Sequence, residues 1–179
     1  MPSKTALIVV DMLNPYDHDD SEALARSVEQ AVPEIERLIG RAADDGVLTI
    51  YVNDNHGAWT SDRHGLVEAA LDGRYPHLVE PVAPADDATF VVKARHSIFF
   101  QTPLEYLLAQ EGVDRVVLSG QVTEQCILYS ALDAYIRHLD VVVPRDAVAH
   151  IHAHLADAAL ELMERNMAAD LCTAADCRL

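Results

Sequence analysis

The feature of this sequence that most constrains its fold is a series of short apolar runs rich in Val, Ile and Leu. A strand covered on both faces of a parallel sheet reads as a continuous apolar run of this kind, without polar alternation. Five runs predict central strands, and a sixth predicts a short edge strand. They are residues 6–10, 47–52, 89–92, 116–118 and 141–143, with the edge strand at 169–172.

Helical patterns lie between these runs. In residues 21–45 apolar side chains recur at steps of three and four, so one helical face packs on the sheet, and Pro33 is expected to split or kink this helix. Residues 57–87 contain one short helical candidate, around residues 66–71, and otherwise read as a long surface connection. Strands that alternate with helices form a parallel sheet covered on both faces. We therefore predict one domain over residues 1–179, a three-layer, Rossmann-like α/β/α fold with a mostly parallel sheet of five to six strands.

Ionisable residues stand at the ends of the predicted strands. Asp11 directly follows the first strand, Lys93 follows the third, and Cys126 comes shortly after the fourth. The carboxyl ends of parallel strands gather at one edge of the sheet, where open α/β folds bind their ligands. We therefore expect these three side chains to meet at that edge.

Cys126 is the candidate nucleophile of this group. Thr123 is expected to cap the following helix, which places Cys126 near the third helical position, where free backbone N–H groups and the helix dipole favour thiolate. A lysine beside the thiol adds to this bias, and a carboxylate beside it can take or return the proton. The alternative is that Cys126 is a small buried residue of the core.

Composition limits the partners of the chain. With 29 acidic and 13 basic residues the formal net charge is −16, which repels phosphate backbones and anionic lipid and leaves a small-molecule substrate. Three cysteines at irregular spacing argue against a disulfide framework. The first apolar run is too short for a signal peptide or a membrane span, so we expect a cytoplasmic protein. No G-x-G-x-x-G motif follows the first strand, which disfavours dinucleotide binding.

A two-ligand metal motif follows the second strand. Asp54 and His56 have the Asp-x-His arrangement that can bind a divalent transition metal, with His64 or His77 as a distant third ligand. The alternative is that the two side chains stabilise the loop through hydrogen bonds.

Four segments carry these candidate residues: ALIVVDMLNPY at 6–16, YVNDNHGAW at 51–59, VVKARHSIFFQTPLEYLL at 91–108 and SGQVTEQC at 119–126. Together they resemble the isochorismatase-like cysteine hydrolase superfamily, and the resemblance extends over nearly the whole chain. It implies an Asp-Lys-Cys catalytic triad formed by Asp11, Lys93 and Cys126. It also implies a cis peptide bond between Val122 and Thr123.

The resemblance implies a function as well. Family members with a cysteine hydrolyse amide, ureide or carbamoyl C–N bonds through a thioester intermediate. The oxyanion hole is expected at the backbone N–H groups of Thr123 and Cys126, beside the cis bond of Val122. The segment NDNHGAW is similar to metal-free members, so we expect no metal or other cofactor. Two alternatives are a metal-assisted, nicotinamidase-like amidase with the metal at Asp54, His56 and His77, and a catalytically silent binding module. The family commonly forms homo-oligomers, here a dimer or a tetramer.

Side chains near the triad in sequence are candidates for substrate binding. Their alternative role is packing and loop hydrogen bonding. These candidates are Asn14, Tyr16, Trp59, His96, Phe99 and Gln125.

Overall fold

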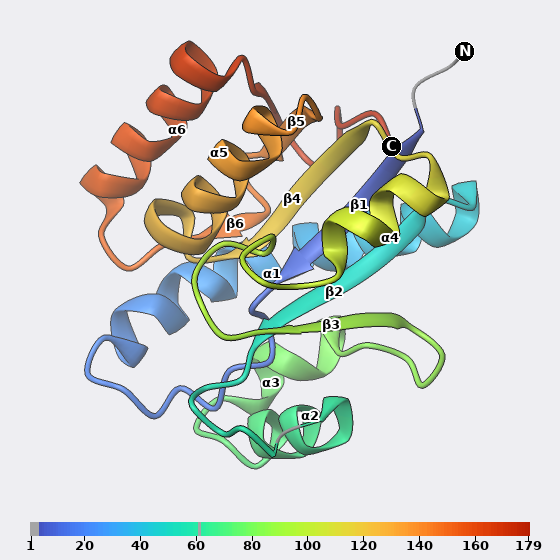
Figure 1. The fold of residues 1–179 in the computed structure, drawn as a ribbon. Helices are drawn as coiled ribbons and strands as arrows, with labels where there is room; N and C mark the ends of the chain where they lie inside the picture. Colours follow the sequence, from blue (N-terminus) through green and yellow to red (C-terminus); the bar gives the residue numbers. More distant parts are fainter. Residues whose placement is uncertain (1–3, 61) are drawn as a thin grey trace.

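The apolar runs form the strands of one parallel sheet. The computed structural model describes residues 4–60 and 62–179. The strands are β1 (Thr5–Val10), β2 (Leu48–Asp54), β3 (Thr89–Lys93), β4 (Arg115–Gln121), β5 (Asp140–Pro144), β6 (Val148–Ala149) and β7 (Asp170–Cys172). Their order in the sheet is β3-β2-β1-β4-β5-β7, and β6 pairs with β4 (Figure 1). Every strand pair in the described part of the chain is parallel.

Helices cover both faces of this sheet, which confirms the three-layer prediction. They are α1 (Ser21–Asp45), α2 (Arg63–Leu71), α3 (Pro76–Val79), the 3₁₀ turn η1 (Glu80–Val82), α4 (Leu104–Glu111), the π-helical turn η2 (Thr123–Ile127), α5 (Leu128–Ile136) and α6 (Ala153–Met167). The core beneath α1, α2 and α3 lies on one face, and the core beneath α4, α5 and α6 lies on the other (Figure 1). Within the described residues, no helix is both long enough and apolar enough to cross a membrane.

Strand β1 shows why these strands lack polar alternation. Leu7 and Val9 belong to the α1 side of the core, whereas Ala6, Ile8 and Val10 belong to the α5 side. Successive side chains of a strand point to opposite faces, and both faces of this sheet exclude water. The continuous apolar run is therefore the direct signature of a central strand between two helical layers.

Three features differ from the sequence-based expectation. The sheet has seven strands, because the two-residue β6 extends the pairing of β4. Helix α1 continues through Pro33, since its buried face, including Val32 and Ile35, packs on the sheet on both sides of the proline. In residues 57–87 the short helix expected around 66–71 is present as α2, but α3 and η1 follow it, and their buried side chains also join the core.

The end of β4 approaches β1 more closely than a side chain permits. Gly120 pairs with Val10 in the parallel register and has a φ of 110°. A Cβ atom added at this position would overlap the carbonyl oxygen of Val10. Glycine is therefore required here both for its backbone conformation and for the space between the two strands.

Gly120→Ala is expected to lower the free energy of unfolding by about 3 kcal/mol or more, because the new methyl group forces the two central strands apart. Gly40→Ala is a matched control, since Gly40 is exposed inside α1 with no atom within 4 Å of the added Cβ. That change should raise stability by about 0.5–1 kcal/mol. Urea denaturation measures both, and equal effects of the two changes would contradict this account of Gly120.

Candidate active site

The parallel register brings three strand ends to one edge of the sheet. Asp54 and Lys93 are direct partners at the ends of β2 and β3. Asp11 follows Val10, the last residue of β1. Asp11 and Lys93 therefore lie together at this edge, as predicted, and Asp54 lies beside them.

Asp11 turns the chain out of β1 and aims its carboxylate along the sheet edge. Its φ of 55° is a left-handed conformation, which non-glycine residues adopt rarely and Asp more readily than most. Its backbone N–H donates to the carbonyl oxygen of Val52 at 2.9 Å, and its Oδ1 accepts a hydrogen bond from the N–H of Asp54 at 2.7 Å. The other oxygen, Oδ2, lies 2.8 Å from Nζ of Lys93.

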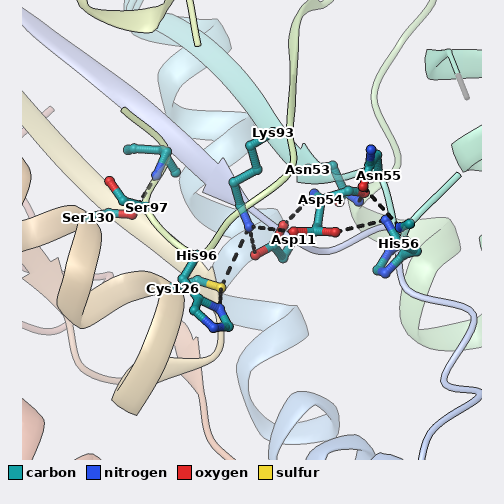
Figure 2. Close-up of polar contacts among 12 residues, drawn as sticks. Asp11, Asn53, Asp54, Asn55, His56, Lys93, His96, Ser97, Cys126 and Ser130 are labelled. Carbon is teal, nitrogen blue, oxygen red and sulfur yellow. Dashed lines mark hydrogen bonds and ion pairs between the residues drawn. The ribbon is translucent and has the colours of Figure 1, made fainter. Parts of the chain in front are cut away.

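Lys93 is the buried cation at the centre of the site. Its side chain is fully buried, and its Nζ contacts Asp11 at 2.8 Å, Oδ2 of Asp54 at 3.5 Å and Sγ of Cys126 at 3.7 Å (Figure 2). Burial lowers the pKa of Lys93, but the negative charges of Asp11 and Asp54 and the hydrogen bond to Asp11 outweigh burial and hold this pKa above its ordinary value. The ammonium therefore stays charged although it has no access to water.

Cys126 lies in η2, the π-helical turn that leads into α5. Its Sγ is 3.7 Å from Nζ of Lys93 and 3.7 Å from Nδ1 of His96 (Figure 2). Burial and the negative charge of Asp11 raise the pKa of this thiol, against the opposing effect of Lys93. The expected bias toward thiolate is therefore wrong for the resting site, because desolvation and Asp11 together outweigh the lysine.

Two local predictions around Cys126 need correction. The cis peptide bond joins Gln121 and Val122, one bond before the predicted Val122–Thr123 position. The pairing of β4 with β6 extends to Gln121, so the chain reverses immediately after that residue. Thr123 does not cap the helix: its hydroxyl donates to the carbonyl oxygen of Ala149 at 2.9 Å, and the residue at the cap position is Val122.

A pocket of about 650 Å³ opens beside this cluster. Two of the predicted substrate-binding residues, Trp59 and His96, line it. Lys93 and Asp54 contribute to its wall, while Cys126, which is 7% exposed, lies behind Lys93 and His96. The lining residues are Asp54, Asn55, Gly57, Ala58, Trp59, Val92, Lys93, Ala94, Arg95, His96, Phe100 and Gln101.

The other four predicted substrate-binding residues lie outside the pocket wall. The side chain of Asn14 accepts a hydrogen bond from the N–H of Tyr16 at 2.7 Å, which closes a turn. Tyr16 is buried, and its hydroxyl lies 3.5 Å from Oε1 of Gln121. The ring of Phe99 is buried under the guanidinium of Arg137, 4.8 Å from its centroid. Gln125 donates its backbone N–H to Val122 within the turn.

The pocket instead receives side chains that sequence position alone did not single out. Phe100 lines it in place of Phe99, because neighbouring side chains of an irregular loop point in different directions. Asn55, Arg95 and Gln101 add polar groups. Arg95 and Phe100 lie in the segment that carried the family resemblance, and this segment was the available signal for both residues.

The metal alternative at Asp54, His56 and His77 does not fit this structure. Oδ2 of Asp54 faces Lys93 and its Oδ1 accepts the N–H of His56, while Nε2 of His56 is 2.9 Å from the carbonyl oxygen of Leu13. His77 lies elsewhere, with Nε2 4.0 Å from Glu29. Within the described ranges, no three His, Cys, Asp or Glu side chains form a cluster that could hold a metal ion. The two loop side chains act through hydrogen bonds and, for Asp54, an ion pair.

Asp11→Asn is expected to speed alkylation of Cys126 by iodoacetamide at neutral pH by about tenfold or more, because removal of the negative charge lowers the thiol pKa and so raises the fraction of thiolate. Mass spectrometry of the modified peptides measures the rate. Cys172 and Cys177 serve as internal controls whose rates should not change. An unchanged or slower reaction of Cys126 would contradict the assignment of Asp11 as a cause of its raised pKa.

Lys93→Met is expected to lower the free energy of unfolding by about 3–5 kcal/mol, because it leaves the buried carboxylate of Asp11 without its counter-charge. Lys4→Met is the matched control: Lys4 forms an exposed ion pair with Glu111 at 3.3 Å, worth at most about 1 kcal/mol. The pKa of Lys93 is higher in the folded protein than in the unfolded chain, where it is about 10.4. The charged ammonium therefore contributes its full amount to the free energy of unfolding below a pH of about 10.4, and this contribution is lost only as the pH rises through the folded-state pKa. Urea denaturation from about pH 6 to 9 should therefore show a constant difference in the free energy of unfolding between the wild-type protein and Lys93→Met. Equal losses of stability in Lys93→Met and Lys4→Met would contradict this account.

Comparisons with known proteins identify the family. The model of the isochorismatase domain matches residues 5–176. An uncharacterized isochorismatase family protein of Bacillus subtilis, YaaI, is 32% identical over 168 residues, which cover 94% of this chain and 93% of that protein. Maleamate amidohydrolase of Pseudomonas putida is 30% identical, covering 84% of this chain and 74% of that enzyme. The crystal structure of N-carbamoylsarcosine amidase from Thermoplasma acidophilum has the same fold, with a TM-score of 0.75, 24% identity, and coverage of 98% of this chain and 99% of that one. The chain therefore belongs to the isochorismatase family of hydrolases, which act on amides and related C–N bonds.

Proposed function

We propose that this protein hydrolyses the C–N bond of a small amide, ureide or carbamoyl compound through a thioester on Cys126. One observation carries the proposal: the buried ammonium of Lys93 joins the Asp11 carboxylate, at 2.8 Å, to the Cys126 thiol, at 3.7 Å. This arrangement pairs a nucleophile with a proton acceptor and a fixed positive charge beside an open pocket. Maleamate amidohydrolase and N-carbamoylsarcosine amidase, both named for C–N hydrolysis, support the choice of bond.

The first step is transfer of the thiol proton to Asp11. The raised pKa of Cys126 keeps the thiol protonated at rest, and the carboxylate of Asp11, which shares the ammonium of Lys93 with the sulfur, is the acceptor for its proton. As the proton leaves, the sulfur gains negative charge beside the ammonium of Lys93, which remains charged throughout. General base catalysis of this kind contributes about 10²- to 10⁴-fold to a rate.

The sulfur then attacks the substrate carbonyl carbon, and a tetrahedral oxyanion forms. The N–H groups of Gln125 and Ile127 both donate to the carbonyl oxygen of Val122, so neither is available to bind the oxyanion. We assign the oxyanion to the backbone N–H groups of Thr123 and Cys126. Each oxyanion donor of this type is worth about 3 kcal/mol of transition-state stabilisation.

Collapse of the tetrahedral intermediate breaks the C–N bond. Protonated Asp11 returns its proton to the leaving nitrogen, so that an unsubstituted amide leaves as ammonia and the acyl group stays on Cys126 as a thioester. Asp11, again ionised, takes a proton from water as the water attacks the thioester. Collapse of this second tetrahedral intermediate breaks the C–S bond, Asp11 returns its proton to the sulfur, and the acid product leaves with the thiol restored.

Cys126→Ala is expected to reduce ammonia release from a panel of small amides and ureides by at least about 10³-fold, because no thioester can form. Cys172→Ala is the matched control, since Cys172 lies on β7 and outside the pocket wall. An enzyme-coupled ammonia assay measures both variants on each compound that the wild-type protein hydrolyses.

Full turnover by Cys126→Ala on such a compound would contradict the thioester mechanism. Absence of turnover by the wild-type protein across the whole panel would favour the catalytically silent binding module.

A further inference from the structure

The backbone of Asp11 is held in its left-handed conformation from both neighbouring strands. A φ of 55° is unfavourable for a residue with a side chain, and such a conformation persists only where the surroundings enforce it. On the β2 side, the N–H of Asp11 donates to the carbonyl oxygen of Val52 at 2.9 Å. On the β4 side, the carbonyl oxygen of Asp11 accepts a hydrogen bond from Nε2 of Gln121 at 2.6 Å. These two bonds fix the peptide units on either side of Asp11.

Side-chain amides replace strand pairing where the chain leaves β1. The parallel pairing of β1 with β4 ends at Val10, so Asp11 lies one residue beyond it and is bonded by the side chain of Gln121 instead. On β2, Asn53 binds the next part of the segment: its Oδ1 accepts the N–H of Leu13 at 2.9 Å, and its Nδ2 donates to the carbonyl oxygen of Leu13 at 3.0 Å. Both amides are buried. Of the two, Gln121 is the one that contacts Asp11 itself.

The surroundings of Gln121 fix the direction of its amide. Its Oε1 lies 3.5 Å from the hydroxyl of Tyr16, and both side chains are buried. Because a carbonyl oxygen only accepts and a hydroxyl can donate, Nε2 faces Asp11 and Oε1 faces Tyr16. Burial raises the pKa of Tyr16, so its hydroxyl keeps the proton that it donates. Tyr16, a candidate for substrate binding in the sequence, therefore supports Gln121.

The direction of the Asp11 carboxylate follows from this backbone conformation. Its Oδ2 lies 2.8 Å from Nζ of Lys93, and its Oδ1 accepts the N–H of Asp54 at 2.7 Å. Relaxation of the backbone toward the extended region would turn the Cβ atom, and with it the carboxylate, away from these partners. The bond from Gln121 opposes that rotation, because it fixes the carbonyl oxygen of Asp11.

We propose that Gln121 is a positioning residue, whose amide holds the peptide unit of Asp11 and thereby keeps the Asp11 carboxylate directed at Lys93 and effective on Cys126. This inference rests on the proposed function for the role of Asp11 as proton acceptor. The influence of Asp11 on the Cys126 thiol does not require turnover, so the two proposals can be tested separately.

The test measures alkylation of Cys126 by iodoacetamide at neutral pH in Gln121→Met, which keeps an unbranched side chain and removes the donor. With Asp11 less firmly held, the pKa of the thiol should fall by about half a unit, and alkylation should be about threefold faster than in the wild-type protein. Gln121→Met combined with Asp11→Asn should react no faster than Asp11→Asn alone, because Gln121 acts through the charge of Asp11.

Ser119→Ala is the matched control. Ser119 is another buried side chain of β4 that donates to a carbonyl oxygen of β1, that of Ile8 at 3.2 Å. Its removal deletes a bond of the same kind between the same two strands, three residues before Asp11, and should leave the alkylation rate unchanged. Urea denaturation verifies that each variant is folded.

Tyr16→Phe is a second, milder variant, because it keeps the ring in the core and removes only the hydroxyl that faces Gln121. It should speed alkylation of Cys126 by less than Gln121→Met does. If Gln121→Met does not fold, Tyr16→Phe decides the question, and a rate equal to that of the wild-type protein would overturn the proposal.

Turnover separates this inference from the proposed function. On each compound that the wild-type protein hydrolyses, Gln121→Met should lower kcat by about tenfold and leave KM nearly unchanged, since proton transfer to Asp11 is impaired and binding is not. Ser119→Ala should retain both values.

An unchanged alkylation rate in Gln121→Met, an equal increase in Ser119→Ala, or an effect that adds to that of Asp11→Asn would overturn the role of Gln121. Faster alkylation that depends on Asp11, together with no ammonia release by the wild-type protein from any compound, would leave the positioning role in place and reject the hydrolytic function. Ammonia release that depends on Cys126, with alkylation and turnover unaffected by Gln121→Met, would do the reverse.

Discussion

The buried ammonium of Lys93 is the interaction on which the rest of the site depends. Removing an ammonium from water is unfavourable by several kcal/mol, and only close, well-placed counter-charges offset this. Here the counter-charges are Asp11 at 2.8 Å and Asp54 at 3.5 Å. Each of the three residues stands at the end of a different strand, so the ion-pair cluster is stable only when β1, β2 and β3 keep their register. The register of these three strands therefore fixes the positions of the charged groups in the site.

That constraint also explains the unusual backbone at the sheet edge. Asp11 adopts a left-handed conformation that turns its carboxylate toward Lys93 and toward the N–H of Asp54. Gly120 allows β4 to approach β1 and so brings the turn that carries Cys126 close to the same carboxylate. The thiol is thereby placed where Asp11 raises its pKa and can receive its proton. At rest, the site therefore keeps the Cys126 thiol protonated.

Most of the fold was predictable from the sequence, and the site was predictable in part. The positions of the central strands and the helical layers follow from local periodicity, and so does the gathering of Asp11, Lys93 and Cys126 at one edge. The position of the cis bond and the capping of η2 were predicted incorrectly, and the candidate Phe99 lies outside the pocket wall that Phe100 lines. Each of these depends on the direction of the backbone within a loop or turn, which is set by tertiary contacts such as the bond from Thr123 to Ala149.

By itself, the sequence determined that apolar strands alternate with helices and that an ionisable residue or a cysteine follows several of them. These properties are local, because hydrophobic periodicity and turn residues act over a few positions of the chain. Only the tertiary structure decided the partner of each charge: Asp54 pairs with Lys93, the Cys126 thiol is held protonated, and Arg95 has no ion-pair partner among the described residues. The physical reason is that ion pairing and desolvation depend on distance and burial, which the fold alone sets.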